Sequence, residues 1–184
     1  MGRYRYETED HELFRASLKK FLEKEAVPHY ETWEEERMVP TAFWRKLGEM
    51  GYLCPQVDEA YGGLGLDFSF GVVISEELER VGSSLVGIGL HNDIVAPYIE
   101  AYANEEQKSR WLPKCVTGEM ILGIAMTEPG AGSDLANIKT TAVQKGDHYI
   151  VNGQKTFITN GIKGNGFVVA VKTNPDATPK HAGI

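Results

Sequence analysis

The chain of 184 residues is 42% hydrophobic and 24% charged, and its formal net charge is −7 at pH 7. This balance is typical of one globular domain or two small ones. It argues against a nucleic-acid partner, because such binding depends on clustered Lys and Arg. No apolar run reaches the ~18 residues of a membrane span, and residues 1–10 lack the apolar core of a secretory signal.

Cysteine and histidine spacing predicts no metal site. Cys54 and Cys115 lie among apolar residues without C-x-x-C spacing, which favours buried free thiols over a disulfide and fits a reducing compartment. The five histidines show no metal-ligand spacing, so we expect each to be a surface residue or a satisfied core residue. They are His11, His29, His91, His148 and His181.

Helical periodicity dominates the chain up to about residue 118. Thr8 is a candidate N-cap of a first helix, and Thr41 begins a second that ends at Gly51. The charged run Glu31–Arg37 indicates a solvated connector or helix face. The inward residues expected of the two helices are Leu13, Phe14, Leu18, Phe21 and Leu22, then Phe43, Trp44, Leu47 and Met50.

Three further helices follow two irregular segments, an extended piece at Tyr52–Pro55 and a closely packed glycine turn at Tyr61–Gly65. Asp67 caps a helix that ends at Gly82, and Ser83 or Ser84 caps a more apolar helix. That helix is either the centre of a bundle or a ligand-facing wall. Asn104-Glu105-Glu106-Gln107 is a capping box, and Pro113 permits at most a kinked continuation of its helix.

After residue 120 the apolar period changes from 3.6 to 2, which predicts strands. The fold class is therefore α+β, with an all-α helical bundle over residues 1–119 and the start of an antiparallel β-domain over 120–184. A hairpin signal, Gln144–Asp147, separates two of the strands. The expected strands are Met120–Met126, Ile138–Val143, His148–Val151, Lys155–Thr159 and Phe167–Lys172.

The first of these strands ends in a glycine-rich turn, Thr127–Asp134. Glu128 precedes a proline, which biases it away from helix, while Gly130 and Gly132 permit close approach of a ligand to the backbone. Neither a dinucleotide-binding nor a Walker glycine pattern is present. The residues alone leave two interpretations open, a ligand-gripping loop and a surface turn at a sheet edge.

The run A-M-T-E-P-G-A-G-S-D at residues 125–134, followed by N-G-Q-K-T-F-I-T-N-G at residues 152–161, resembles the acyl-CoA dehydrogenase family. Tyr61-Gly62-Gly63 and Asn104–Lys108 also resemble it. The resemblance covers nearly the whole chain but only the first part of a family member, because the rest of the β-domain and a C-terminal helical domain are absent from these 184 residues.

The resemblance implies a flavin enzyme that dehydrogenates acyl-CoA thioesters to trans-2-enoyl-CoA in fatty-acid β-oxidation, with FAD as cofactor. Phe157 would pack on the isoalloxazine, where many members carry Trp; the alternative is an inward-facing strand aromatic. Ser133 would contact both FAD and the acyl-CoA substrate. The implied cofactor-binding residues are Ile124, Met126, Thr127, Gly132, Ser133, Phe157, Ile158 and Thr159.

No catalytic residue is predicted within the chain. The family's glutamate base lies in the C-terminal helical domain, so the chain alone is expected to be inactive. Glu128 lies in the right neighbourhood for a base, but its place before Pro129 suits turn geometry.

Further family properties are expected of the full-length protein: an electron-transfer flavoprotein as acceptor, a homo-oligomer (tetramer or dimer), and a cytoplasmic location in a bacterium or the mitochondrial matrix otherwise. The motifs and the closing His181–Ile184 most resemble the long-chain branch. The alternatives are an acyl-CoA oxidase or nitroalkane oxidase on the same scaffold, and a non-catalytic truncated fragment.

Overall fold

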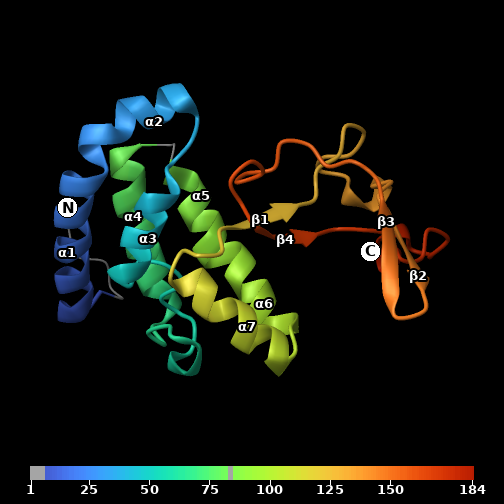
Figure 1. Cartoon of the computed structure of the whole chain (residues 1–184), viewed down its shortest axis with the longest axis horizontal. Helices are drawn as coiled ribbons and strands as arrows, with labels where there is room; N and C mark the ends of the chain where they lie inside the picture. Colours follow the sequence, from blue (N-terminus) through green and yellow to red (C-terminus); the bar gives the residue numbers. More distant parts are fainter. Residues whose placement is uncertain (1–6, 83–84) are drawn as a thin grey trace. The chain divides into compact units, whose positions relative to one another are not determined.

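The computed structural model describes residues 7–82 and 85–184, and the chain divides into two compact units, Met1–Leu122 and Gly123–Ile184 (Figure 1). Within the described residues, all α-helices precede all strands, as the change of apolar period predicts. The helices are α1 (Glu9–Glu25), α2 (Tyr30–Glu36), α3 (Thr41–Glu49), α4 (Phe68–Val81), α5 (Val86–Gly89), the π-helix η4 (Leu90–Val95), α6 (Ala96–Tyr102) and α7 (Glu105–Val116). The strands are β1 (Leu122–Ala125), β2 (Thr141–Lys145), β3 (His148–Asn152) and β4 (Gly166–Val169).

The predicted helix starts are confirmed wherever the structure describes them. At α7 the Gln107 N–H donates to Asn104 Oδ1 over 2.9 Å, and Gln107 Oε1 accepts the Asn104 N–H over 3.0 Å, which completes the capping box. Asp67 caps α4 by accepting the Ser69 N–H, and Thr8 is the N-cap of α1. The cap predicted at Ser83 or Ser84 lies outside the described residues.

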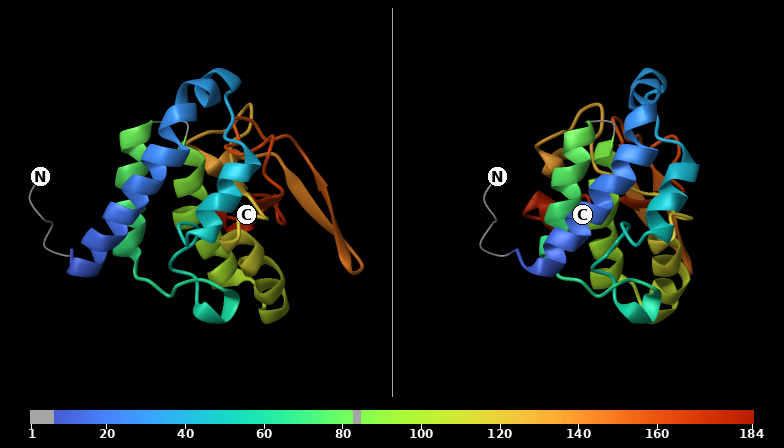
Figure 2. Two further views of the ribbon diagram at one scale, coloured as in Figure 1. Left: turned by 60° about the vertical axis from the view of Figure 1, so that its left-hand side comes forward. Right: turned by 90° about the vertical axis from the view of Figure 1, so that its left-hand side faces the viewer.

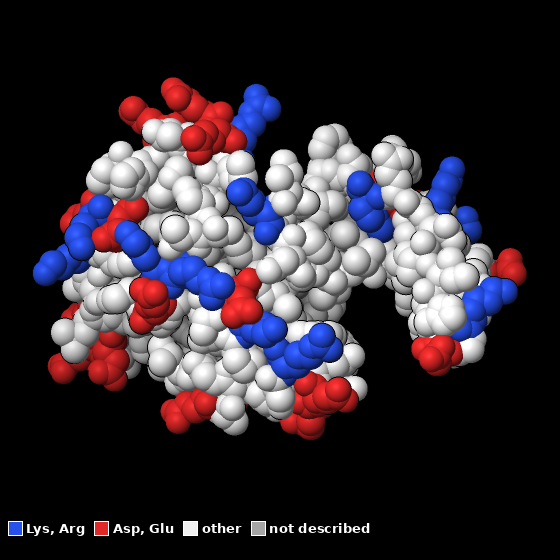
Figure 3. Space-filling view, in the orientation of Figure 1, with Lys and Arg blue, Asp and Glu red and all other residues white. Residues whose placement is uncertain are grey.

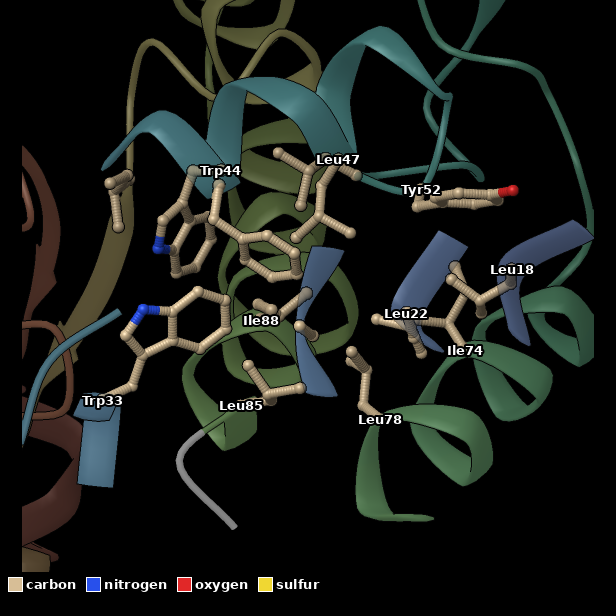
Figure 4. Packing of buried hydrophobic residues seen from close by; sticks show 14 residues of the cluster. Leu18, Leu22, Trp33, Trp44, Leu47, Tyr52, Ile74, Leu78, Leu85 and Ile88 are labelled. Atoms are coloured by element: carbon tan, nitrogen blue, oxygen red, sulfur yellow. The ribbon is translucent and has the colours of Figure 1, made fainter. Parts of the chain in front are cut away.

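The core of the helical unit is a cluster of aliphatic side chains and tryptophans, with Leu22, Leu47 and Ile88 near its centre (Figure 4). Helices α1 and α4 pack side by side against it (Figure 2). The prediction that the helices point these residues inward is wrong for two of them: Leu13 is 70% exposed and Met50 is half exposed. Leu13 precedes Phe14 by one residue and so points about 100° away from it around the helix.

The charged run that includes α2 lies on the surface, as predicted. All residues of Glu31–Arg37 are exposed except Trp33, which joins the core. Figure 3 shows their acidic side chains gathered over α2. The run is therefore the solvated face of an amphipathic helix.

A polar stretch in η4 organises the segment that follows α3. Asn92 Oδ1 accepts the Cys54 N–H over 2.8 Å, and Asn92 Nδ2 donates to the Tyr52 carbonyl over 3.0 Å. The prediction of an extended piece at Tyr52–Pro55 is wrong, because a buried side chain rather than a strand satisfies this backbone and Cys54 adopts a positive φ of 47°. Cys54 and Cys115 are free and buried, which confirms that prediction.

His91, also in η4, is a satisfied core histidine. Its Nδ1 accepts the N–H of Leu122 over 3.1 Å, so Nε2 carries the proton that is donated to the Cys115 carbonyl, also over 3.1 Å.

The turn at Tyr61–Gly65 is closely packed, as predicted. A Cβ on Gly63 would lie 1.8 Å from the Val57 carbonyl oxygen.

The second unit holds two two-stranded sheets, β1 with β4 and β2 with β3. The predicted hairpin is confirmed: β2 and β3 are antiparallel, and the pair Lys145 and His148 closes the turn at Gly146. The predicted strand Lys155–Thr159 is wrong, because this segment is irregular and both Phe157 and Asn160 have positive φ. Among the described residues, no helix is long and apolar enough to cross a membrane.

Candidate functional site

The turn after β1 is closed by its own backbone. The Glu128 N–H donates to the Ala131 carbonyl over 2.8 Å, and the Ala131 N–H donates to the Glu128 carbonyl over 3.1 Å. Pro129 and Gly130 form its exposed tip, and the exposed Gly132 and Ser133 follow. This geometry presents a short stretch of backbone on the surface of the second unit.

Nothing inside the described chain requires glycine at Gly130 or Gly132. Neither has a positive φ, and a Cβ added to either would meet no atom within 4 Å. Gly153 is the opposite case, with φ of 157° and only 2.2 Å between an added Cβ and the Thr140 hydroxyl oxygen. The open space above Gly130 and Gly132 therefore suits a ligand that approaches the backbone closely.

Phe157 is an exposed aromatic residue whose backbone conformation is energetically unfavourable. Its side chain is 91% exposed, and its φ of 54° lies in the left-handed region. The alternative of an inward-facing strand aromatic is wrong, since Phe157 is neither in a strand nor buried. A left-handed non-glycine residue costs of order 1–3 kcal/mol, and such residues cluster at ligand clamps and active sites.

The structure brings the two motif segments together. The Thr156 N–H donates to the Thr127 carbonyl over 3.0 Å, and Lys155 Nζ donates to the Met126 carbonyl over 2.9 Å. A Cβ on Gly123, in β1, would lie 2.9 Å from the Thr159 carbonyl oxygen. Residues 124–127 and 156–159 therefore lie side by side.

The predicted site residues differ in exposure. Ile124, Met126, Thr127 and Ile158 are half-buried, whereas Gly132, Ser133, Phe157 and Thr159 are exposed. That Ser133 shares a surface with Phe157 stays a prediction. Among the described residues, no group of His, Cys, Asp and Glu side chains could hold a metal ion.

Glu128 is buried in a network that motif reading did not anticipate. Oε2 accepts the Lys139 N–H over 2.6 Å, and Oε1 accepts the Thr140 N–H over 3.0 Å and the Thr140 hydroxyl over 2.5 Å. Lys155 Nζ lies 2.9 Å from Oε1. The sequence signal was a lysine within the second motif and an acid within the first, but their pairing depends on the fold.

This network makes Glu128 a poor proton acceptor. Burial alone would raise the pKa of Glu128, but the hydrogen bonds from Thr140, Lys139 and Lys155 outweigh it and lower the pKa to about 2. A carboxylate this acidic stays ionised at neutral pH and has little tendency to take up a substrate proton.

The chain is similar to known proteins over both of its units. Residues 8–119 match the family model "Acyl-CoA dehydrogenase, N-terminal domain", and residues 123–184 match "Acyl-CoA dehydrogenase, middle domain". The chain belongs to the acyl-CoA dehydrogenase family.

Individual family members are similar along nearly the whole chain. A crystal structure of an acyl-CoA dehydrogenase from Geobacillus kaustophilus superposes with a TM-score of 0.96 at 68% identity, covering 98% of this chain and 48% of that one. A Bacillus anthracis acyl-CoA dehydrogenase complexed with FAD gives a TM-score of 0.86 at 33% identity, covering 93% of this chain and 30% of that one.

Two curated relatives differ in substrate. The long-chain specific acyl-CoA dehydrogenase of Sus scrofa mitochondria is 40% identical over 182 residues, which is 98% of this chain and 42% of the relative. The isovaleryl-CoA dehydrogenase of Bos taurus mitochondria is 38% identical over 175 residues, 93% of this chain and 41% of the relative. The chain thus spans less than half the length of each of these four proteins.

Proposed function

We propose that this chain is the N-terminal and middle region of an FAD-dependent enzyme that dehydrogenates acyl-CoA thioesters to trans-2-enoyl-CoA. The observation that supports the proposal is the contact between the two motif segments, here called the junction, where the Thr156 N–H donates to the Thr127 carbonyl. The turn that follows Thr127 contains Gly130 and Gly132, and both glycines face open space. In this proposal, residues 1–119 form the α-domain and residues 120–184 form part of the β-domain.

The chemistry of the junction fits a flavin. Thr127 and Thr159 provide hydroxyl donors for the ring, and Phe157 provides an apolar face to cover it. The exposed backbone of Gly132 and Ser133 suits the pyrophosphate. FAD would supply the redox chemistry as the hydride acceptor, and the chain's own residues would bind and orient it. The named FAD complex of a relative supports this cofactor.

We assign no base among the 184 residues, because the network around Glu128 lowers its pKa and so makes it a weak proton acceptor. The acceptor that we propose is an electron-transfer flavoprotein, and the assembly is a homo-oligomer. The chain is 40% identical to a long-chain specific relative and 38% identical to an isovaleryl-CoA relative. We propose a long-chain substrate and a place in fatty-acid β-oxidation.

The test is a flavin titration followed by an assay. The purified full-length protein is titrated with FAD and then mixed with short, long and branched acyl-CoA thioesters and an artificial electron acceptor. Saturable flavin binding, with reduction fastest for long chains, would support the proposal. Peroxide formation in place of acceptor reduction would favour an oxidase, and failure to bind FAD would contradict the cofactor assignment for this chain.

Ser133→Ala refines this test. Loss of one hydrogen bond, worth about 1 kcal/mol, should weaken FAD or acyl-CoA binding about fivefold. Ser109→Ala is the matched control, because Ser109 is exposed on α7 and outside both motifs. Equal affinities of the two variants would remove Ser133 from the site.

A further inference from the structure

One carboxylate joins three separate segments of the second unit. Glu128 receives hydrogen bonds from Lys139 and Thr140, eleven and twelve residues later, and from Lys155, twenty-seven residues later. The ion pair is well shielded, since the side chain of Glu128 is 5% exposed and that of Lys155 is 11% exposed. A charge shielded to this extent is stable only while its partner is present.

The same ion pair holds the backbone on both sides of the junction. Lys155 Nζ bonds the Met126 carbonyl, the Thr156 N–H bonds the Thr127 carbonyl, and the Glu128 side chain is fixed by its own network. Three consecutive residues, Met126 to Glu128, are therefore tied down. On the other segment, Phe157 to Thr159 follow directly after the tied Lys155 and Thr156.

We propose that Glu128 and Lys155 are a positioning pair that sets the spacing of the two flavin-contacting segments without contacting the flavin. The pair uses none of the side chains assigned to the flavin, so Thr127, Phe157 and Thr159 remain available to it. This inference rests on the proposed function for its flavin readout, but the geometry of the clamp can be tested without flavin.

The decisive comparison is between single and double variants. Glu128→Gln leaves a buried ammonium uncompensated and Lys155→Met leaves a buried carboxylate uncompensated, so each should lower the thermal midpoint and raise the Kd for FAD about tenfold or more. The double variant buries no lone charge, so its thermal midpoint should recover in part. Its Kd for FAD should stay raised about tenfold, because Lys155→Met removes the donor to the Met126 carbonyl and Glu128→Gln leaves one acceptor oxygen where the carboxylate had two.

Two further variants keep the test interpretable. Thr140→Val preserves shape and removes only the hydroxyl bond to Glu128, so it should fold normally and raise the Kd for FAD about threefold to fivefold. Asp147→Asn is the matched control for the carboxylate-to-amide change, because Asp147 is fully exposed on the hairpin turn and should bind FAD as the wild type does.

Two outcomes would overturn the proposal. If affinity in the double variant recovers in step with the thermal midpoint, the pair acts through stability alone. If Glu128→Gln in the full-length protein binds FAD normally, with an unchanged visible spectrum, but loses reduction by acyl-CoA, Glu128 is a base and not a positioning residue.

If the proposed flavin function is wrong, these measurements give a different set of results. If the wild-type chain binds no FAD, the flavin assignment is contradicted, and amide hydrogen exchange then decides the clamp. Glu128→Gln should accelerate exchange at Thr140 and Thr156, while amides paired between β2 and β3 exchange at the wild-type rate. Unchanged exchange at Thr140 and Thr156 would overturn the clamp independently of any flavin.

Discussion

Phe157 combines an exposed aromatic ring with a left-handed backbone, and neither property benefits the chain itself. Phe157→Gly should therefore raise the free energy of unfolding of the second unit by about 1 kcal/mol, because glycine adopts this φ without strain. The same change should weaken FAD binding, because the ring face is lost.

Chemical denaturation and flavin titration of the same variant check both halves of this prediction. Ile162→Gly is the control, since Ile162 is similarly exposed but lies outside the motif and has no positive φ. Destabilisation by Phe157→Gly would show that the ring packs within the chain.

His91 should make the helical unit sensitive to acid. Burial lowers the pKa of His91 to about 4, although its bond to the Cys115 carbonyl opposes the shift. The unfolded chain takes up a proton near pH 6.5 and the folded one only near pH 4, so the contribution to stability is complete above 6.5 and is lost as the pH falls toward 4. The expected loss is about 2 kcal/mol at pH 5.

Urea unfolding at pH 7.5 and at pH 5, followed by tryptophan emission, measures this loss. His148→Gln should keep the pH dependence of the wild type, because His148 is exposed on β3. A His91→Gln protein that retained the full pH dependence would refute the assignment to His91.

At the scale of elements, two asparagines should contribute differently to the free energy of unfolding. Asn92 in η4 satisfies two buried backbone groups, at Cys54 and Tyr52, whereas Asn104 caps the exposed start of α7. Asn92→Ala should cost about 2–5 kcal/mol of unfolding free energy, because it leaves buried groups unpaired. Asn104→Ala should cost about 1 kcal/mol. Equal losses in denaturant titrations would contradict the role given to Asn92.

The elements that the sequence predicts well are those specified by neighbouring residues. The Asn104–Gln107 capping box, the Asp67 cap and the hairpin turn at Gly146 depend on contacts within a few positions, and all three are confirmed. The segment Lys155–Thr159 reads as a strand from its composition, but its backbone is set by bonds to residues 126 and 127.

The Glu128 network was not predicted because it depends on contacts between residues that are distant in the sequence. Motif resemblance predicts which residues surround the junction, and this stays a prediction. The hydrogen bonds that Glu128 accepts from Lys139, Thr140 and Lys155 span eleven to twenty-seven positions and follow no local spacing rule. Tyr52–Pro55 was mispredicted for the same reason, because its partner Asn92 is about forty positions away.

At the scale of the whole molecule, the two compact units should unfold at different denaturant concentrations. All three tryptophans, Trp33, Trp44 and Trp111, belong to the first unit, so tryptophan emission reports on that unit alone. Lys155→Met should lower the denaturation midpoint of the second unit, which is measured from the NMR amide signals of the hairpin. The midpoint seen by tryptophan should stay at the wild-type value.

A common midpoint for both probes, shifted together by Lys155→Met, would show that the units unfold as one.

The bond between His91 and Leu122 has a consequence for biosynthesis. The amide that opens β1 is bonded to a side chain thirty-one residues earlier, in a helix that also packs against Trp44. Because synthesis proceeds from the N-terminus and domains fold as units, the acceptor ring leaves the ribosome well before the strand that it will hold. The nascent helical unit thus provides the acceptor for the amide of Leu122 before the rest of β1 has been synthesised.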